Sequence, residues 1–242
     1  MNQTFFENIN NPEAIVYRFS SRDIRATPDQ VARYFGGPRF KPDRRHLEQI
    51  TTFLERAAGL IEPAYITALY PLAKKDLKGR ICIGNGVTLP VPVNRLNALP
   101  RQLAVCVCTL GGRLDETCRD FSDHHNIYDA TLMDAVGISL ADALADRVHR
   151  RIMKQATDLG LFAGCRFGPG YGDMPMTAQT DLFRLVNADS IGVKLNGSLM
   201  MDPVKSLSFL VVLGARQSRT GSAGKCSHCG LKSCQFRVFK IK

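Results

Sequence analysis

The first group of residues whose types suit chemistry is a glycine-rich segment in the second half of the chain. It consists of Arg166, Phe167, Gly168, Pro169, Gly170 and Tyr171. Arginine presents five N–H donors in a rigid fork that fits a carboxylate or a phosphate. Glycines let the backbone approach a ligand without a Cβ atom in the way. The alternative interpretation is an ordinary tight turn beside a surface arginine, and composition alone does not separate the two.

The second group is a pair of acids, Asp142 and Asp146, whose spacing places both on one face of a predicted helix. A carboxylate accepts hydrogen bonds from an ammonium group or from ribose hydroxyls. The alternative is ordinary solvated polarity with ion pairs to neighbouring arginines, and the residue types alone favour that alternative. These arginines are Arg147, Arg150 and Arg151.

The third group is a set of three cysteines, Cys226, Cys229 and Cys234, near the end of the chain. Cysteines this close together indicate a metal site rather than free thiols, and a disulfide framework is not expected without a secretory signal. Zinc needs a fourth ligand, for which His228 is a candidate. A [4Fe–4S] cluster also needs four ligands, and Cys165 or a cysteine from elsewhere could complete it.

The positive charge of the chain is concentrated in the same region. The 242 residues carry a formal net charge of +10, and residues 216–242 contain seven lysines and arginines but no acid. A basic zinc-binding protein that contacts nucleic acid is therefore the alternative function. Only Phe236 and Phe239 could stack on bases there, so nucleic acid is not the expected partner.

No apolar run reaches the roughly 18–20 residues that are needed to cross a membrane. No signal peptide is expected, and the expected location is the cytoplasm.

Hydrophobic periodicity predicts the helices, and runs of β-branched residues predict the strands. The helices are expected at residues 27–36, 43–62, 127–158 and 178–188. The strands are expected at residues 14–23, 64–72, 80–93, 102–110, 191–200 and 206–214. Cys106 and Cys108 are interpreted as small packing residues in a buried strand. The segment after Gly164 is predicted to be irregular because of its glycines and prolines.

This mixed order of helices and strands predicts an α+β fold with a largely antiparallel, twisted sheet flanked by helices and a C-terminal metal-binding tail. Residues 1–100 are expected to be an N-terminal segment of the same domain as residues 101–214. Residues 215–225 are predicted to be a flexible linker and residues 226–242 a cysteine-rich basic tail. A body of about 215 residues buries a sufficient core without help from a metal.

Together these segments resemble the activation domain of cobalamin-dependent methionine synthase, which binds S-adenosylmethionine (AdoMet). The resemblance runs from about residue 100 to residue 214. It is carried by AVCVCTLGG, by the helix YDATLMDAVGISLADALADRVHRRI, by the loop RFGPGYGDMP and by IGVKLNGSLMMDPVKSLSFLVVLG. The loop that follows the long helix is its most specific part. The first hundred residues resemble free-standing bacterial versions of this domain.

The resemblance implies roles for the first two groups of residues. Arg166 matches the arginine that contacts the AdoMet carboxylate, and residues 167–170 match the backbone that lines the adenosyl site. Tyr171 matches the loop tyrosine near the ligand and the corrin. Asp142 matches an acidic residue that contacts AdoMet, although the fused family form has a longer glutamate there, so Asp146 stays a second candidate.

The activity that the resemblance implies is the reductive reactivation of a corrinoid-dependent methyltransferase, within which this chain acts as one part. Cob(I)alamin is occasionally oxidised to inert cob(II)alamin, and its rescue needs one electron and a methyl group from AdoMet. The implied partners are a cobalamin-binding protein, either methionine synthase or another corrinoid protein, and a reductant such as flavodoxin or ferredoxin. No catalytic side chain is expected, since orientation and the partner's cobalamin supply the chemistry. The need for an electron favours iron–sulfur over zinc in the tail.

Overall fold

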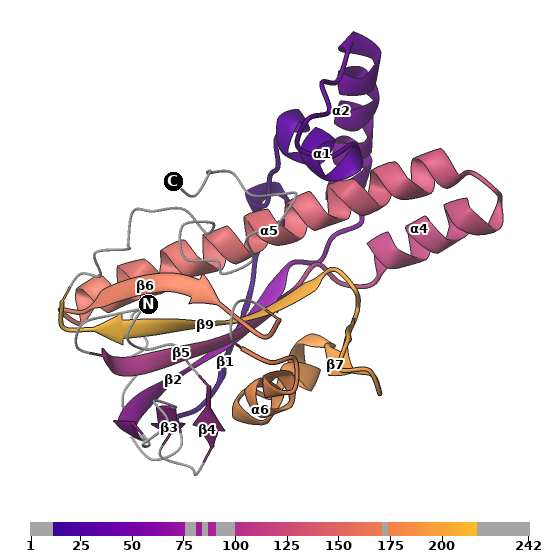
Figure 1. Cartoon of the computed structure of the whole chain (residues 1–242). Coiled ribbons are helices and arrows are strands. Elements are labelled where there is room, and N and C mark those ends of the chain that lie inside the picture. The colour runs from indigo at the N-terminus through magenta and orange to yellow at the C-terminus, as the bar shows by residue number, and fades with distance from the viewer. Residues whose placement is uncertain (1–11, 76–80, 84–86, 91–99, 171–173, 217–242) are drawn as a thin grey trace.

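A computed structural model of the chain describes residues 12–75, 81–83, 87–90, 100–170 and 174–216. An antiparallel sheet with the strand order β4-β3-β2-β5-β9-β6 forms its centre, and β1 also pairs with β2 (Figure 1). The strands are β1 (Ile15–Arg18), β2 (Ala64–Lys75), β3 (Ile81–Ile83), β4 (Thr88–Leu89), β5 (Pro100–Thr109), β6 (Phe162–Phe167) and β9 (Ser206–Gly214). A separate two-stranded sheet joins β7 (Lys194–Leu195) to β8 (Met201–Asp202).

The described helices are α1 (Pro28–Phe35), α2 (Arg44–Ala58), α4 (Arg113–Asp123), α5 (Ile127–Asp158) and α6 (Ala178–Leu185), with short 3-10 turns at Ser21–Asp23 and Ala188–Ile191. Of these, α5 packs on one face of the large sheet and α6 packs on the other. Cys106 and Cys108 of β5 point to the face that α5 covers, whereas Val105 and Val107 point to the face on which α6 packs. This alternation follows from the period of two along a strand. Both cysteines are buried, as the sequence predicted.

The long helix α5 crosses one face of the sheet and carries much of the core beneath it (Figure 1). A close approach at Gly137 explains one of its small residues, because a Cβ atom there would lie 2.6 Å from Cε of Lys205. Glycine therefore leaves room for the buried Lys205 side chain. The Lys205 Nζ lies 2.5 Å from Asp134 Oδ1 and 3.7 Å from Asp115 Oδ1, so the buried cation is paired.

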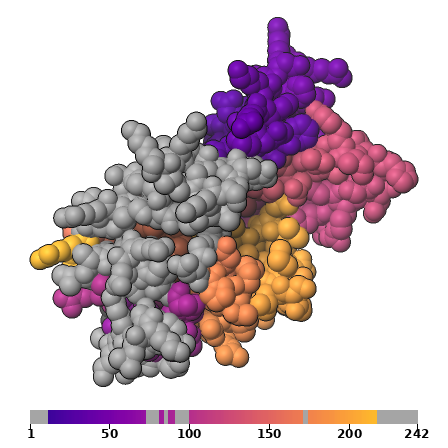
Figure 2. Space-filling model, in the orientation of Figure 1, coloured from indigo at the N-terminus to yellow at the C-terminus, as the bar shows by residue number. Residues whose placement is uncertain are grey.

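The helices α1 and α2 lie against α5 and project beyond the sheet as a lobe near the N-terminal half of α5 (Figures 1 and 2). Thr27 begins α1 with a capping box that it shares with Gln30, and Pro28 occupies the first helical position. Asp43 caps α2 by accepting a hydrogen bond from the backbone N–H of His46. Both helices lie within the ranges predicted from the sequence, residues 27–36 and 43–62.

The α+β class, the antiparallel sheet and the flanking helices confirm the fold predicted from the sequence. The predicted strand at residues 191–200 was wrong. Its first residue closes a 3-10 turn, only Lys194–Leu195 are extended, and a tight turn then leads directly into β8. The sequence analysis also missed α4, whose residues are more polar than apolar although Leu114, Cys118 and Phe121 recur at helical spacing.

Among the described residues, none of the helices combines the length and the apolar character needed to cross a membrane. The predicted linker beyond residue 216 and the predicted tail at residues 226–242 lie outside the described residues.

Candidate functional site

Arg166 lies in β6, at the edge of the sheet, where its backbone pairs with Val211 of β9. The prediction of irregular structure directly after Gly164 was therefore wrong for residues 165–167, which continue the strand. Hydrogen bonding to β9 holds these residues extended in spite of the glycines on either side. Regular structure ends only at Gly168.

A β-bulge in β6 turns the Arg166 side chain toward α5. Ala163 pairs with Leu213 and Arg166 pairs with Val211, so three steps along β6 stand against two along β9. In a regular strand, residues three apart point to opposite faces. The extra residue places Ala163 and Arg166 on the same face, which is the one that α5 covers.

His149 of α5 contacts the bulge directly. Its Nε2–H donates a hydrogen bond to the backbone oxygen of Gly164 at 2.8 Å. The imidazole therefore joins the helix to the irregular point of the strand that sets the direction of Arg166. The sequence analysis did not select His149, although a glycine inside a strand is a known sign of a bulge.

Arg166 and the two predicted acids, Asp142 and Asp146, come together as a carboxylate–guanidinium cluster. The Arg166 Nη2 atom lies 2.5 Å from Asp146 Oδ1 and 3.4 Å from Asp142 Oδ1. The arginine side chain is only 10% exposed, whereas Asp142 and Asp146 are 38% and 41% exposed. The acids thus pair across the fold with Arg166, and both remain accessible from solvent.

The floor of this cluster is apolar. The guanidinium carbon of Arg166 lies 5.3 Å from the centroid of the Phe209 ring, close enough for a cation–π interaction. Burial raises the pKa of the Cys106 and Cys108 thiols to about 12, and the nearby positive charge of Arg166 lowers it only in part. The thiols beneath the arginine are therefore neutral packing groups.

The chain leaves β6 through a tight turn that only glycine permits at its first residue. A Cβ atom on Gly168 would lie 2.6 Å from the backbone oxygen of Ser208 in β9. Pro169 is buried beside it. Gly170 has a φ of +80°, in the left-handed region that favours glycine, and its N–H donates to the oxygen of Met174 at 2.9 Å. The turn is therefore packed against β9, and it begins two residues after Arg166.

The cluster has the donors and acceptors for a ligand that carries both charges. The Nη2 group of Arg166 pairs with Asp142 and Asp146, and arginine has five N–H donors in all. Each carboxylate has about four acceptor positions. A ligand carboxylate can therefore approach the arginine fork while a ligand ammonium group approaches Asp142 or Asp146.

Several predicted site residues cannot be placed in this way. Tyr171 and the three tail cysteines, Cys226, Cys229 and Cys234, lie outside the described residues. Within the part of the chain that the structure describes, no group of three or more His, Cys, Asp and Glu side chains could hold a metal ion. The iron–sulfur and zinc interpretations of the tail therefore stay predictions.

Comparison with known proteins decides the family. Residues 95–233 match the family described as "Vitamin B12 dependent methionine synthase, activation domain". The chain belongs to this family. The matched region contains the whole carboxylate–guanidinium cluster, the bulge and the glycine turn, so the resemblance drawn from the sequence is confirmed.

A solved structure extends the likeness beyond the matched region. The chain is similar to the "Crystal Structure of the MetH Reactivation Domain bound to AdoHcy", with a TM-score of 0.59 and 16% sequence identity. The similarity covers 84% of this chain and 79% of that chain. At 16% identity, this similarity shows that the two chains share a fold. The shared fold includes parts of this chain before residue 95.

Proposed function

We propose that this activation-domain protein binds AdoMet at the carboxylate–guanidinium cluster and takes part in the reductive remethylation of a cobalamin-dependent methyltransferase. The observation that carries the proposal is the ion pairing of Arg166, two residues before the glycine turn, with both Asp142 and Asp146. A solved relative of the same fold has AdoHcy bound, which supports this class of ligand.

The residues of the cluster fit the amino-acid end of AdoMet. Its carboxylate would accept from the Arg166 fork, and its α-ammonium group would donate to Asp142 or Asp146. The planar fork suits a carboxylate better than a lysine would. The backbone of residues 168–170 would lie against the adenosyl part, while the Cβ positions of Gly168 and Gly170 face Ser208 and Met176 of the protein itself.

The chemistry requires no nucleophile from this chain. AdoMet supplies an electrophilic methyl group when it is bound, and the nucleophilic cobalt belongs to the partner. The residues of the cluster bind the ligand, fix its orientation and keep it at a defined place on the surface for a docking partner. We propose that the partner is methionine synthase and that a flavodoxin or a ferredoxin supplies the electron.

An anaerobic remethylation assay tests the proposal. A methionine synthase fragment that lacks its own activation domain is loaded with cob(II)alamin and mixed with a reductant, AdoMet and this chain. Absorbance should report methylcobalamin only when both AdoMet and the chain are present. The Arg166→Ala variant is the matched control and should slow the reaction at subsaturating AdoMet. Methylcobalamin that forms equally fast without the chain would exclude the proposed role.

A further inference from the structure

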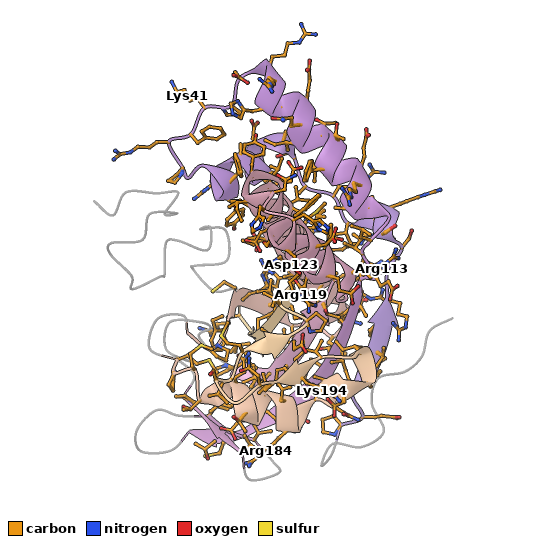
Figure 3. All side chains as sticks on the ribbon, turned by 90° about the vertical axis from the view of Figure 1, so that its right-hand side faces the viewer. Lys41, Arg113, Arg119, Asp123, Arg184 and Lys194 are labelled. Carbon is orange, nitrogen blue, oxygen red and sulfur yellow. The ribbon has the colours of Figure 1, made fainter. Side chains whose placement is uncertain are left out.

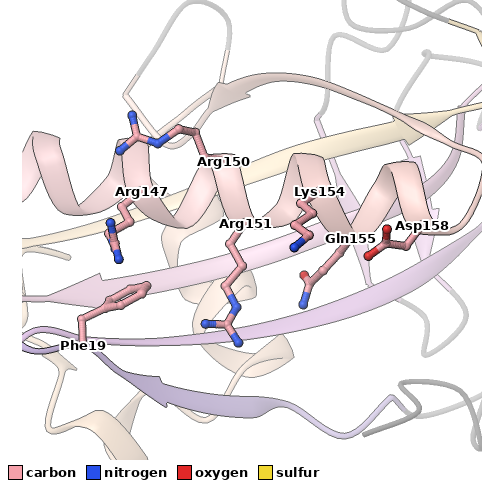
Figure 4. A pocket seen from close by; sticks show the side chains of 7 residues that line it. All are labelled: Phe19, Arg147, Arg150, Arg151, Lys154, Gln155 and Asp158. Atoms are coloured by element: carbon pink, nitrogen blue, oxygen red, sulfur yellow. The ribbon is translucent and has the colours of Figure 1, made fainter. Parts of the chain in front are cut away.

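A second concave site lies further along α5 than Asp142 and Asp146. It is a groove of about 470 Å³, called here the basic groove, between the C-terminal half of α5 and the segment after β1. Its lining residues are Phe19, Arg147, Arg150, Arg151, Lys154, Gln155 and Asp158. Figure 4 shows Arg147, Arg151, Lys154 and Gln155 pointing from α5 to the side on which Phe19 lies. Successive helical residues are about 100° apart, so Arg147 and Arg151 lie about 100° and 140° around α5 from Asp146, whereas Arg150 lies only about 40° from it.

Aromatic rings hold two of the arginines in place. The guanidinium carbon of Arg151 lies 4.3 Å from the ring centroid of Tyr17, and that of Arg147 lies 5.2 Å from the ring centroid of Phe19. Tyr17 and Phe19 themselves stack on Tyr65, so the rings are fixed by the sheet. A guanidinium held against an aromatic face keeps N–H groups at its edge for a further partner. These two cations are therefore partly preorganised for a planar or tetrahedral anion.

The groove carries more positive charge than its own acids balance. Four cations line it together with one acid, Asp158, and among the described residues Asp23 pairs with one of them, with its Oδ1 3.2 Å from Arg147 Nη2. Arg150 and Lys154 are exposed and form no ion pair with any residue that the structure describes. The local excess is thus about two positive charges. A phosphate monoester carries about −1.5 to −2 at neutral pH, whereas a simple carboxylate carries only one negative charge.

We propose that the basic groove is a binding site for a small ligand with a terminal phosphate ester. The volume suits a ligand of ordinary small-molecule size, the charge excess matches a phosphate dianion, and arginine forks bind phosphate oxygens in pairs. The four cations span eight residues of α5, or about 10 Å along the helix at 1.5 Å per residue. That short length favours one phosphate group with its attached body over an extended nucleic-acid strand.

A pair of matched ligands tests the site. Phenyl phosphate and benzoate share an apolar ring and differ in their anionic group, and both are titrated by calorimetry into the full-length protein at low salt. Phenyl phosphate should bind with one saturable site and at least tenfold more tightly than benzoate. Equal affinity for the two ligands, or the absence of saturable phenyl phosphate binding, would overturn the proposal.

Charge-matched variants locate the site. Arg150→Gln/Lys154→Gln removes two exposed cations of the groove, and Arg184→Gln/Lys194→Gln removes two exposed cations from the side of the sheet on which α6 packs (Figure 3). The first variant should weaken phenyl phosphate binding at least tenfold, and the second should change it less than twofold. Equal weakening in both would mean unspecific attraction and would overturn the proposal.

Two further measurements separate this site from other interpretations. The affinity for AdoMet should be the same in the groove variant and in the wild type, because this variant keeps Arg166, Asp142 and Asp146; a parallel loss would mean that the groove is no separate site. A 12-nucleotide single strand should not displace phenyl phosphate. Displacement that strengthens as the strand is lengthened would assign the groove to nucleic acid instead.

Discussion

Arg166 and Asp146 are joined by a 2.5 Å contact that links the edge strand β6 to the middle of α5 across 20 residues of chain. The same Nη2 atom lies 3.4 Å from Asp142, one helical turn earlier. Two carboxylates on one helix face repel each other, and the guanidinium between them offsets that repulsion. The arginine is therefore both a structural link and the centre of the proposed AdoMet site.

Replacing Arg166 should weaken AdoMet binding. Arg166→Ala removes the charge and the fork, and a hydrogen bond to a charged group contributes roughly 1.5–3 kcal/mol, so the dissociation constant should rise at least about tenfold. Arg166→Lys keeps the charge but loses the paired geometry, and it should recover only part of the affinity. Calorimetric titration with AdoMet measures both effects. Unchanged affinity in the alanine variant would remove Arg166 from the site.

The two acids should differ in what they contribute. Asp146 is the nearer partner of Arg166, so Asp146→Asn should lower the unfolding midpoint more than Asp142→Asn does. Asp142 is less tightly held, and its loss should weaken AdoMet binding about fivefold or more with little change in stability. Urea unfolding and AdoMet titration of both variants decide between them. If only Asp146→Asn lowered the affinity for AdoMet, the ligand contact would belong one turn further along α5.

The turn after β6 should not tolerate a side chain at its first glycine. The Cβ atom of Gly168→Ala would lie 2.6 Å from the backbone oxygen of Ser208 and 3.4 Å from Cα of Phe209. The backbone must move to relieve that contact, and this should lower the free energy of unfolding by about 1–3 kcal/mol. Gly197→Ala is the matched control, because nothing lies within 4 Å of its added Cβ atom. Urea midpoints that fall equally in both variants would contradict this account of the turn.

Much of the site could be predicted from the sequence because its residues lie in short, recognisable patterns. The spacing of Asp142 and Asp146 placed both on one helix face, and the residue types around Arg166 indicated an anion-binding fork. The partner of the acids was not predictable, because Arg166 is 20 residues or more away and reaches them only through the bulge in β6. Spacing within the helix instead favoured Arg147, Arg150 and Arg151 as ion-pair partners of the two acids. In the structure, both acids pair with Arg166.

The helices were easier to predict than the edges of the sheets. The expected helix at residues 127–158 coincides with α5, because its apolar positions recur over many turns and Asn126 caps it. The sequence predicted no strand at β6, since its extended shape comes from pairing with β9 rather than from its own residues. At residues 191–200, a run of apolar residues was read as one strand although short turns interrupt it.

The buried thiols of Cys106 and Cys108 should make stability depend on alkaline pH. Burial raises the pKa of each thiol from 9.0 to about 12, so an unfolded chain loses these protons at a lower pH than the folded chain. The contribution of the neutral thiols to the free energy of unfolding is present below pH 9 and is lost as the pH rises toward 12. Between pH 8 and pH 10 the loss should be about 1 kcal/mol or more. Urea unfolding under reducing conditions measures it.

The matched variant for this test is Cys106→Ala/Cys108→Ala. It lacks both thiols but keeps the lysines and tyrosines that also titrate in this range, so its stability should fall less steeply between pH 8 and pH 10. The same pH dependence in both proteins would mean that other groups are responsible.

The last prediction concerns the cysteines beyond the described residues. Both hydrophobic clusters are formed by residues between Ile24 and Leu213, so a chain that ends at residue 215 should fold and bind AdoMet as the full chain does. The full chain, prepared without oxygen, should carry an iron–sulfur cluster on Cys226, Cys229 and Cys234. A flexible tether of about 10 residues spans roughly 16–19 Å, which is enough to bring such a cluster near a docked corrinoid.

Replacing these three cysteines by serine in the full chain tests the role of the thiols while the rest of the tail is kept. The triple variant should keep its AdoMet affinity, lose iron, and slow the reduction of cob(II)alamin in the partner. Cys82→Ser is the control, because Cys82 lies in β3, away from the tail sequence, and should change none of the three readouts. Stoichiometric zinc without iron in the anaerobic wild type would refute electron transfer through the tail. AdoMet binding at Arg166 would stand in that case, since the two sites share no residue, and the tail would then be a structural or docking element.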